Sequence, residues 1–220
     1  SAAWKQAARA ELAANNKNIY HAQLLLDLVK AFERVPHWAL LREAVRLDYP
    51  LWLVRLSLNT YRLDRTLRVG QVYSRMLKAS RGITAGSGFA TSEMRLMLID
   101  LMDSAVVIHR LIELTVYVDD IAIDASGSYK AVKEAIVGFG KLVCKGITDD
   151  GMTVSSTKSV CAASCSQLGH DICSSLKLYG IKPQSNVKSL GVGMNAGRRR
   201  TTKVQQARLH KFRKRPFRNL

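Results

Sequence analysis

The sequence lacks any apolar run close to the roughly 20 residues that a membrane-spanning helix needs. It also lacks a secretory signal peptide, and it begins at Ser1 instead of an initiator methionine. These absences predict a protein that is not secreted, has no transmembrane segment and takes no membrane as a partner. Because the initiator methionine is missing, we expect the chain to be part of a larger polyprotein.

Cysteine is scarce, and the few cysteines are clustered: Cys144, Cys161, Cys165 and Cys173. Four cysteines in 220 residues exclude a disulfide-stabilised scaffold. Cys161, Cys165, His170 and Cys173 follow the ligand order of a zinc knuckle, but with different spacing. We favour buried, reduced thiols here and keep zinc binding as the alternative.

Acidic residues are few: 17 Asp and Glu stand against 34 Lys and Arg, a formal net charge of +17. Residues 198–220 contain ten Lys or Arg and no acid, so they hold +10, and residues 1–197 hold the remaining +7. On charge alone, both parts suit a polyanion partner, with nucleic acid first and an anionic membrane surface second, and we expect nucleic acid. We expect one globular domain over residues 1–197, followed by a basic segment over residues 198–220.

The spacing of apolar residues predicts both helices and strands. Helices are predicted over residues 2–14, 36–45, 50–58, 90–101 and 132–143, and strands over residues 20–29, 116–123, 151–154, 158–160 and 187–192. A further hairpin is predicted over residues 66–76, around a Gly70-Gln71 turn. This order fits an α+β fold, in which helices back an antiparallel sheet.

Two adjacent carboxylates, Asp119 and Asp120, lie at the middle of the apolar run 116–123 (VYVDDIAI). Strand-forming residues on both sides predict a strand, a tight turn and a second strand, with the acid pair at the turn. Alternation along the first strand would direct Val116 and Val118 into a core and Asp119 to the opposite face. The alternative is an acidic turn that is simply exposed to solvent.

A third carboxylate, Asp27, is the single charge in the aliphatic run 24–29 (LLLDLV). If the two predicted strands are neighbours, Asp27 and Asp119 converge at one edge of the sheet. Clustered carboxylates repel one another unless cations neutralise them, and Mg²⁺ prefers such oxygen ligands. Paired Mg²⁺ ions on carboxylates are typical of enzymes that transfer phosphoryl or nucleotidyl groups.

With these residues in view, the sequence resembles the reverse transcriptases of non-LTR (LINE-like) retrotransposons. Residues 27–37 (DLVKAFERVPH) look like the first catalytic motif of that family, and residues 117–120 (YVDD) look like its Tyr-x-Asp-Asp box. The segments that resemble the template-contacting motif, the following lysine motif and the primer grip are residues 81–87 (RGITAGS), 151–158 and 190–192. The motifs occur in the family's order.

The resemblance implies a polymerase palm with a ferredoxin-like core, partial fingers and the start of a basic thumb. It implies RNA-directed DNA polymerase activity, in which dNTPs are added to the 3′-hydroxyl of a DNA primer on an RNA template. Asp27, Asp119 and Asp120 would be the catalytic residues and would hold two Mg²⁺ ions, which Mn²⁺ can replace. The family also implies a nuclear or nucleocytoplasmic location, and further fingers, thumb and endonuclease parts in a larger polyprotein.

The resemblance gives Phe32, Gly82, Gly86 and Lys158 roles at the incoming nucleotide. Phe32 would exclude a ribose 2′-hydroxyl, although a core aromatic would leave the same trace in the sequence. Lys158 would contact the triphosphate, although a lone lysine is more often a surface charge.

Contacts to primer and template are implied for a set of basic residues: Arg81, Lys188, Arg198, Arg199, Arg200, Lys203, Arg208 and Lys211. For the last six, a disordered basic tail or a nuclear-import signal is the alternative. For the whole chain, two other functions remain open. One is a degenerate nucleic-acid-binding relic without catalysis, and the other is an RNA-binding protein similar to group II intron maturases.

Overall fold

The computed structural model of the chain describes residues 2–16, 18–84, 86–189, 192–195, 206–207 and 209–210. The chain divides into two compact units. Unit 1 comprises residues 1–27, 106–142 and 155–220, and unit 2 comprises residues 28–105 and 143–154. Within the described part of the chain, no helix is both long and apolar enough to cross a membrane.

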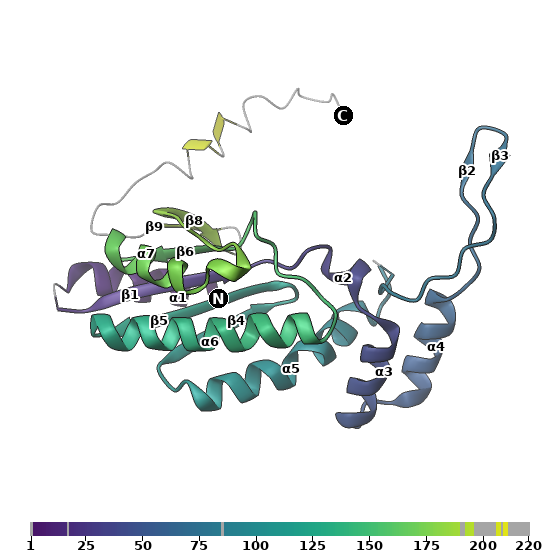
Figure 1. Cartoon of the computed structure of the whole chain (residues 1–220), viewed down its shortest axis with the longest axis horizontal. Coiled ribbons are helices and arrows are strands. Elements are labelled where there is room, and N and C mark those ends of the chain that lie inside the picture. Colours follow the sequence, from purple (N-terminus) through teal and green to yellow (C-terminus); the bar gives the residue numbers. More distant parts are fainter. Residues whose placement is uncertain are drawn as a thin grey trace. The chain divides into compact units, whose positions relative to one another are not determined.

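Unit 1 is built on a five-stranded sheet with the order β4-β5-β1-β6-β7 (Figure 1). The strands are β1 (Tyr20–Leu26), β4 (Ile112–Tyr117), β5 (Asp120–Gly127), β6 (Val160–Ala163) and β7 (Lys182–Pro183). All neighbours are antiparallel except β6 and β7, which are parallel. A separate hairpin follows, formed by β8 (Asn186–Ser189) and β9 (Val192–Asn195). The expected antiparallel sheet is therefore present, with one parallel pair at its edge.

Helices back one face of this sheet. The apolar periodicity predicted α6 (Tyr129–Asp149), whose residues 129–142 belong to unit 1, but it did not predict α7 (Ser166–Ser175). Leu24 lies opposite Ile123 and Cys161 in the neighbouring strands, and all three side chains are buried. Gly140 of α6 approaches the sheet so closely that a Cβ atom there would lie 2.9 Å from Leu24 Cδ2. The absence of a side chain thus sets the distance between helix and sheet.

The opposite face of the sheet carries a buried ion pair. Arg9 of α1 (Ala2–Asn15) donates a hydrogen bond of 3.2 Å to Asp124 of β5, whose side chain is 1% exposed. Burial raises the pKa of Asp124 to about 6, against the opposing effect of the Arg9 charge. Burial, together with the Arg9 charge, also lowers the pKa of the neighbouring His21 to about 4, so His21 is neutral at pH 7. Arg9 is therefore the cation that compensates Asp124.

Unit 2 is mainly helical. It contains α2 (Ala31–Arg34), α3 (His37–Arg46), α4 (Leu51–Tyr61) and residues 90–105 of α5 (Ala90–Ile108). It also contains a two-stranded ribbon, β2 (Arg68–Val69) and β3 (Val72–Tyr73), which extends away from α4 (Figure 1). Inside the helical part, the Tyr61 hydroxyl donates a buried hydrogen bond of 2.7 Å to Glu93. The helices predicted over residues 36–45, 50–58 and 90–101 and the hairpin around Gly70 are confirmed.

The prediction of a strand pair over residues 151–154 and 158–160 is wrong. Residues 151–154 form no strand, and only Val154 makes an isolated bridge, to Leu28. The second strand, β6, begins at Val160. Gly151 turns the chain with a φ of 77° directly after α6. The Ser155 amide and the Ser159 hydroxyl then bond to the backbone of Asp27 instead of to another strand.

Candidate active site

The β4–β5 hairpin ends in a turn of only two residues. Tyr117 pairs with Asp120, and Val118 and Asp119 form the turn between them. The predicted order of strand, tight turn and strand is thus confirmed. The expected burial of the valines is wrong, because Val116 remains 39% exposed. The reason is that β4 is the edge strand of the sheet, where packing against other elements is least complete.

The turn holds Val118 in a strained backbone conformation. Its φ is 59°, in the left-handed region that a β-branched residue rarely occupies. In a two-residue hairpin turn, a positive φ at the first position usually belongs to glycine. Such strain costs of order 1–3 kcal/mol and is concentrated at functional sites. The strained residue directly precedes Asp119, so the conformation of Val118 sets where that carboxylate leaves the sheet.

Replacement of Val118 by glycine should therefore stabilise unit 1. Release of about 1–3 kcal/mol of strain exceeds the roughly 0.5–1 kcal/mol entropic cost of an added glycine, so Val118→Gly should be about 1 kcal/mol more stable in urea unfolding. The matched control is Val116→Gly, which makes the same chemical change at an unstrained strand position. It should destabilise the protein. Loss of stability in both variants would contradict the assignment of strain to Val118.

The strand register brings Asp27 to this hairpin. Leu26 of β1 lies opposite Ile121 of β5, and it is the last residue of its strand. Asp27 directly follows this last pair, and Asp120 directly precedes Ile121, so both acidic segments begin at the same end of the sheet. Convergence of the Asp27 and Asp119 carboxylates stays a prediction.

Two buried serines fix the backbone of Asp27. The Ser155 amide donates to the Asp27 carbonyl at 2.8 Å, and the Asp27 amide donates to Ser159 Oγ at 3.1 Å. Ser155 and Ser159 are 5% and 1% exposed. Asp27 therefore leaves the end of β1 from a rigid position. Sequence reasoning did not identify these serines, although their place around Lys158 in the lysine motif was an available signal.

Lys158 pairs with Asp27. Its Nζ lies 3.2 Å from Asp27 Oδ1 and 3.4 Å from Oδ2. The two side chains are 68% and 25% exposed, so solvent screens the pair and its net stabilisation is at most about 1 kcal/mol. The ammonium group therefore neutralises Asp27. Another cation can replace the ammonium group beside Asp27 at little cost, and a phosphate can attract the ammonium group away from Asp27.

The carboxylates alone do not enclose a metal ion. Among the described residues, no three His, Cys, Asp or Glu side chains are grouped closely enough to hold one. Mg²⁺, however, is commonly bound by one or two carboxylates, with waters and substrate phosphates completing its shell. Asp27 and Asp119 each offer carboxylate oxygens, the hard ligand type that Mg²⁺ prefers.

Within unit 2, the structure joins α2 to the glycine-rich segment. The Ile83 amide donates to the carbonyl of Phe32 at 2.7 Å, and the Gly82 amide donates to the carbonyl of Val35 at 2.8 Å. Gly82 has a φ of 101°, and a Cβ there would lie 3.1 Å from the Glu33 carbonyl oxygen. Glycine is therefore required at this contact. Two residues predicted to act at the nucleotide, Phe32 and Gly82, are thus neighbours.

Buried His37 completes this junction. Its Nε2 donates to the Gly82 carbonyl at 2.9 Å, and its Nδ1 accepts from Arg62 Nε at 3.3 Å. Burial lowers the pKa of His37, which agrees with the neutral tautomer that these partners require.

The other residues predicted to contact nucleotide or nucleic acid are placed as follows. Gly86 has a φ of 90° and open space where a Cβ would be. Arg81 is exposed, and its backbone forms an isolated bridge with Pro36. The backbone of Lys188 lies in β8. The remaining predicted contacts, Arg198, Arg199, Arg200, Lys203, Arg208 and Lys211, lie outside the described residues.

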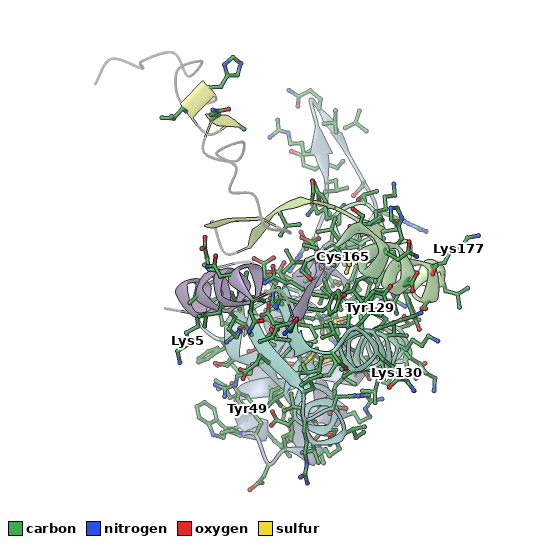
Figure 2. All side chains as sticks on the ribbon, turned by 90° about the vertical axis from the view of Figure 1, so that its left-hand side faces the viewer. Lys5, Tyr49, Tyr129, Lys130, Cys165 and Lys177 are labelled. Carbon is green, nitrogen blue, oxygen red and sulfur yellow. The ribbon has the colours of Figure 1, made fainter. Side chains whose placement is uncertain are left out.

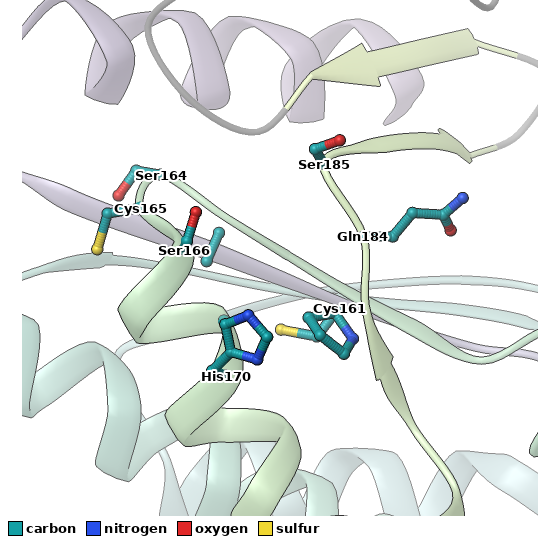
Figure 3. A pocket seen from close by; sticks show the side chains of 10 residues that line it. Cys161, Ser164, Cys165, Ser166, His170, Gln184 and Ser185 are labelled. Atoms are coloured by element: carbon teal, nitrogen blue, oxygen red, sulfur yellow. The ribbon is translucent and has the colours of Figure 1, made fainter.

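The residues considered for zinc do not meet at one point. Cys161 and His170 line one side of a pocket, and Cys165 lies at its other side (Figure 3). A hydrogen bond to Cys173, together with burial, raises the pKa of the Cys161 thiol, which disfavours the thiolate that zinc requires. Cys144, Cys161 and Cys173 are buried free thiols, and Cys165 is a partly buried one.

The chain has a mixed α/β fold, with a mostly antiparallel sheet backed by helices. No known family of protein sequences matches it, and no curated protein sequence matches it. Its structure is similar to a telomerase from Candida tropicalis in complex with a TWJ fragment of telomeric RNA, with a TM-score of 0.61 and 11% identity over 96% of this chain and 36% of that chain. It is also similar to an apo telomerase from the same organism, truncated from its C-terminal domain, with a TM-score of 0.51 and 13% identity over 88% of this chain and 38% of that one.

The chain therefore spans little more than a third of the telomerases that it matches. At these identities, the similarity shows the fold alone, a fold that the chain shares with part of these telomerases. The closer relation to non-LTR retrotransposons stays a prediction from the sequence motifs.

Proposed function

We propose that this chain is the palm of an RNA-directed DNA polymerase of the non-LTR retrotransposon type. The observation that supports the proposal is the register of β1 and β5, in which Leu26, the residue before Asp27, pairs with Ile121 at the end of the sheet that carries the strained turn. The order β4-β5-β1-β6 supports a ferredoxin-like core for this palm. The similarity in fold to telomerases supports the same class of enzyme.

In this proposal, Asp27 and Asp119 bind Mg²⁺ or Mn²⁺, and Asp120 contributes a further carboxylate. The bound ions supply the Lewis acid that nucleotidyl transfer requires. Ser155 and Ser159 hold Asp27 in place while its charge is shared with a cation. Lys158, released from Asp27, pairs its ammonium group with the phosphates of the incoming nucleotide. The weak, exposed Asp27–Lys158 pair suits that exchange.

The remaining roles follow the motifs. Phe32 excludes ribonucleotides, and Gly82 and Gly86 shape the segment that meets the nucleotide. Arg81, Lys188 and the basic residues of the 198–211 segment contact the RNA template and DNA primer. Residues 1–197 form the palm with partial fingers, and residues 198–220 begin the thumb. The rest of the polymerase and an endonuclease lie in a larger polyprotein that acts in the nucleus.

A second candidate is a nucleic-acid-binding relic that no longer catalyses. Two observations favour it. Lys158 already neutralises Asp27, and the acidic side chains form no three-ligand group among the described residues. The two candidates differ in one respect that can be measured, namely whether binding is followed by incorporation of nucleotides.

The test is primer extension by this chain on an RNA template with a labelled DNA primer and dNTPs. We expect extension in Mg²⁺ or Mn²⁺ and none after chelation with EDTA, because removal of the ions removes several kcal/mol of transition-state stabilisation. Calorimetry should separately show Mg²⁺ binding that requires Asp27 and Asp119. If the primer–template binds but is never extended, the relic is the correct function.

A further inference from the structure

Residues 62–81, called here the basic ribbon, concentrate positive charge on an exposed arm of unit 2. They contain six basic residues and one acid, a net charge of +5: Arg62, Arg65, Arg68, Arg75, Lys78, Arg81 and Asp64. The acid is already paired, since Asp64 Oδ1 lies 3.7 Å from Lys78 Nζ. Residues 62–73, up to the end of β3, are all exposed. The arm therefore presents cations with little local compensation.

The strand register sorts the side chains of this ribbon onto two faces. Arg68 lies directly opposite Tyr73, so both project from the same face. Arg75 follows Tyr73 by two positions on the same exposed arm. The Arg68 guanidinium lies 5.4 Å from the centroid of the Tyr73 ring, and Tyr73 is 60% exposed. One face of the ribbon is thus basic and aromatic.

The other face is apolar. Val69 lies opposite Val72, and Leu67 stands two positions before Val69. Val69 and Val72 are 81% and 73% exposed. An isolated two-stranded hairpin is only marginally stable in water, so additional contacts would stabilise it. A bound partner would therefore both contact the basic face and stabilise the hairpin.

Backbone hydrogen bonds extend the ribbon beyond its two short strands. Arg65 and Leu77 exchange hydrogen bonds of 3.0 and 2.8 Å, and Ser74 donates to the Leu67 carbonyl at 2.8 Å. One residue separates Arg65 from Leu67, but two separate Ser74 from Leu77, so the second strand contains a one-residue bulge. The paired backbone sets Arg68 beside Tyr73, and the bulge contains Arg75.

We propose that the basic ribbon binds a single-stranded segment of nucleic acid. Arg68 and Arg75 contact successive phosphates, for which the planar guanidinium is well suited. Tyr73 stacks on an unpaired base, in the combination of cations and aromatic rings that single-strand-binding surfaces use. None of these three residues belongs to the proposed catalytic or template-contacting set, and the binding requires neither metal nor catalysis.

Fluorescence anisotropy with a labelled single-stranded oligonucleotide, measured in EDTA, tests this surface. For Arg68→Ala/Arg75→Ala, loss of two phosphate contacts should lower the slope of log affinity against log salt by about 1.4, and the affinity at 0.1 M salt about 25-fold. The matched control is Lys130→Ala/Lys177→Ala. It removes the same charge from outward-pointing side chains of unit 1, and it should leave affinity within about twofold (Figure 2).

The aromatic contact has its own control. Tyr73→Ala should weaken single-strand binding at least about fivefold, whereas Tyr73→Phe should preserve it, because stacking does not require the hydroxyl. If the ribbon and control double variants lose the same affinity for the oligonucleotide, net charge alone explains the loss, and the proposal is overturned. If polyglutamate displaces the labelled oligonucleotide as effectively as unlabelled oligonucleotide does, the partner is an acidic protein, and the proposal is also overturned. Because no metal is present, failure of primer extension does not affect either result.

Discussion

Asp27→Asn should abolish nucleotide incorporation while leaving the fold and nucleic-acid binding intact. The amide keeps the size of the side chain and the backbone bonds to Ser155 and Ser159, so β1 should still end in the same place. It loses the negative charge that would attract a cation. If the ion supplies about 4 kcal/mol of transition-state stabilisation, the rate constant for primer extension should fall about 10³-fold. Asp119→Asn should have an effect of the same order.

The matched control for these variants is Asp149→Asn. Asp149 is an exposed residue of α6 that pairs only weakly, at 3.7 Å, with Lys145. The substitution makes the same chemical change at a residue to which no catalytic role is assigned, so extension should remain within about twofold of the wild type. Incorporation by Asp27→Asn at the rate of this control would disprove the assignment of Asp27 to the catalytic site. Calorimetric titration with Mg²⁺ gives a second readout, in which Asp27→Asn should lose binding.

Arg9→Met should destabilise unit 1 by about 3 kcal/mol at pH 8, because it leaves the Asp124 carboxylate buried without its cation. Asp124 must then be protonated in the folded state. The free-energy cost of keeping Asp124 protonated rises by about 1.36 kcal/mol for each pH unit by which the solution pH exceeds the unfolded pKa near 3.8. In the wild type, the pKa of Asp124 is about 6, so the carboxylate ionises below pH 8 and the cost is smaller.

The same pair predicts a pH dependence of definite sign. The folded-state pKa of Asp124 lies above its unfolded value, so the folded state binds more protons between about pH 4 and 6. This contribution to stability is present at low pH and is lost as the pH rises through the folded pKa. At pH 5, Asp124 is largely protonated with or without Arg9. The penalty of Arg9→Met should therefore shrink to about 1 kcal/mol or less.

Urea unfolding of Arg9→Met and wild type at pH 8 and pH 5 measures this difference. Arg9→Lys keeps the charge and should recover most of the lost stability. Glu113→Gln removes the other partner of Arg9, which lies at 3.6 Å and is 66% exposed, and it should cost less than about 0.5 kcal/mol. A penalty for Arg9→Met that is equal at both pH values would mean that lost packing, and not the buried charge, causes the effect.

Local patterns in the sequence were sufficient for most elements. The apolar stripe of α6 predicted its buried face, and Val132, Ile136, Phe139 and Val143 are all fully buried. The acid pair within a β-branched run predicted the hairpin and its turn. The error at residues 151–160 arose because a short apolar run does not reveal whether its backbone will pair with a strand. There, the serine-rich loop bonds to Asp27 instead.

Spacing within short segments was enough to predict the acidic hairpin, the helix α6 behind the sheet and the hairpin around Gly70. Contacts between distant residues do not follow from such spacing. They fix Asp27 through Ser159, 132 positions away, and pair Arg9 with Asp124, 115 positions away. The edge position of β4 leaves Val116 exposed, although alternation alone predicted its burial. Side-chain periodicity determines which face of a strand is apolar, whereas strand order and register determine what that face meets.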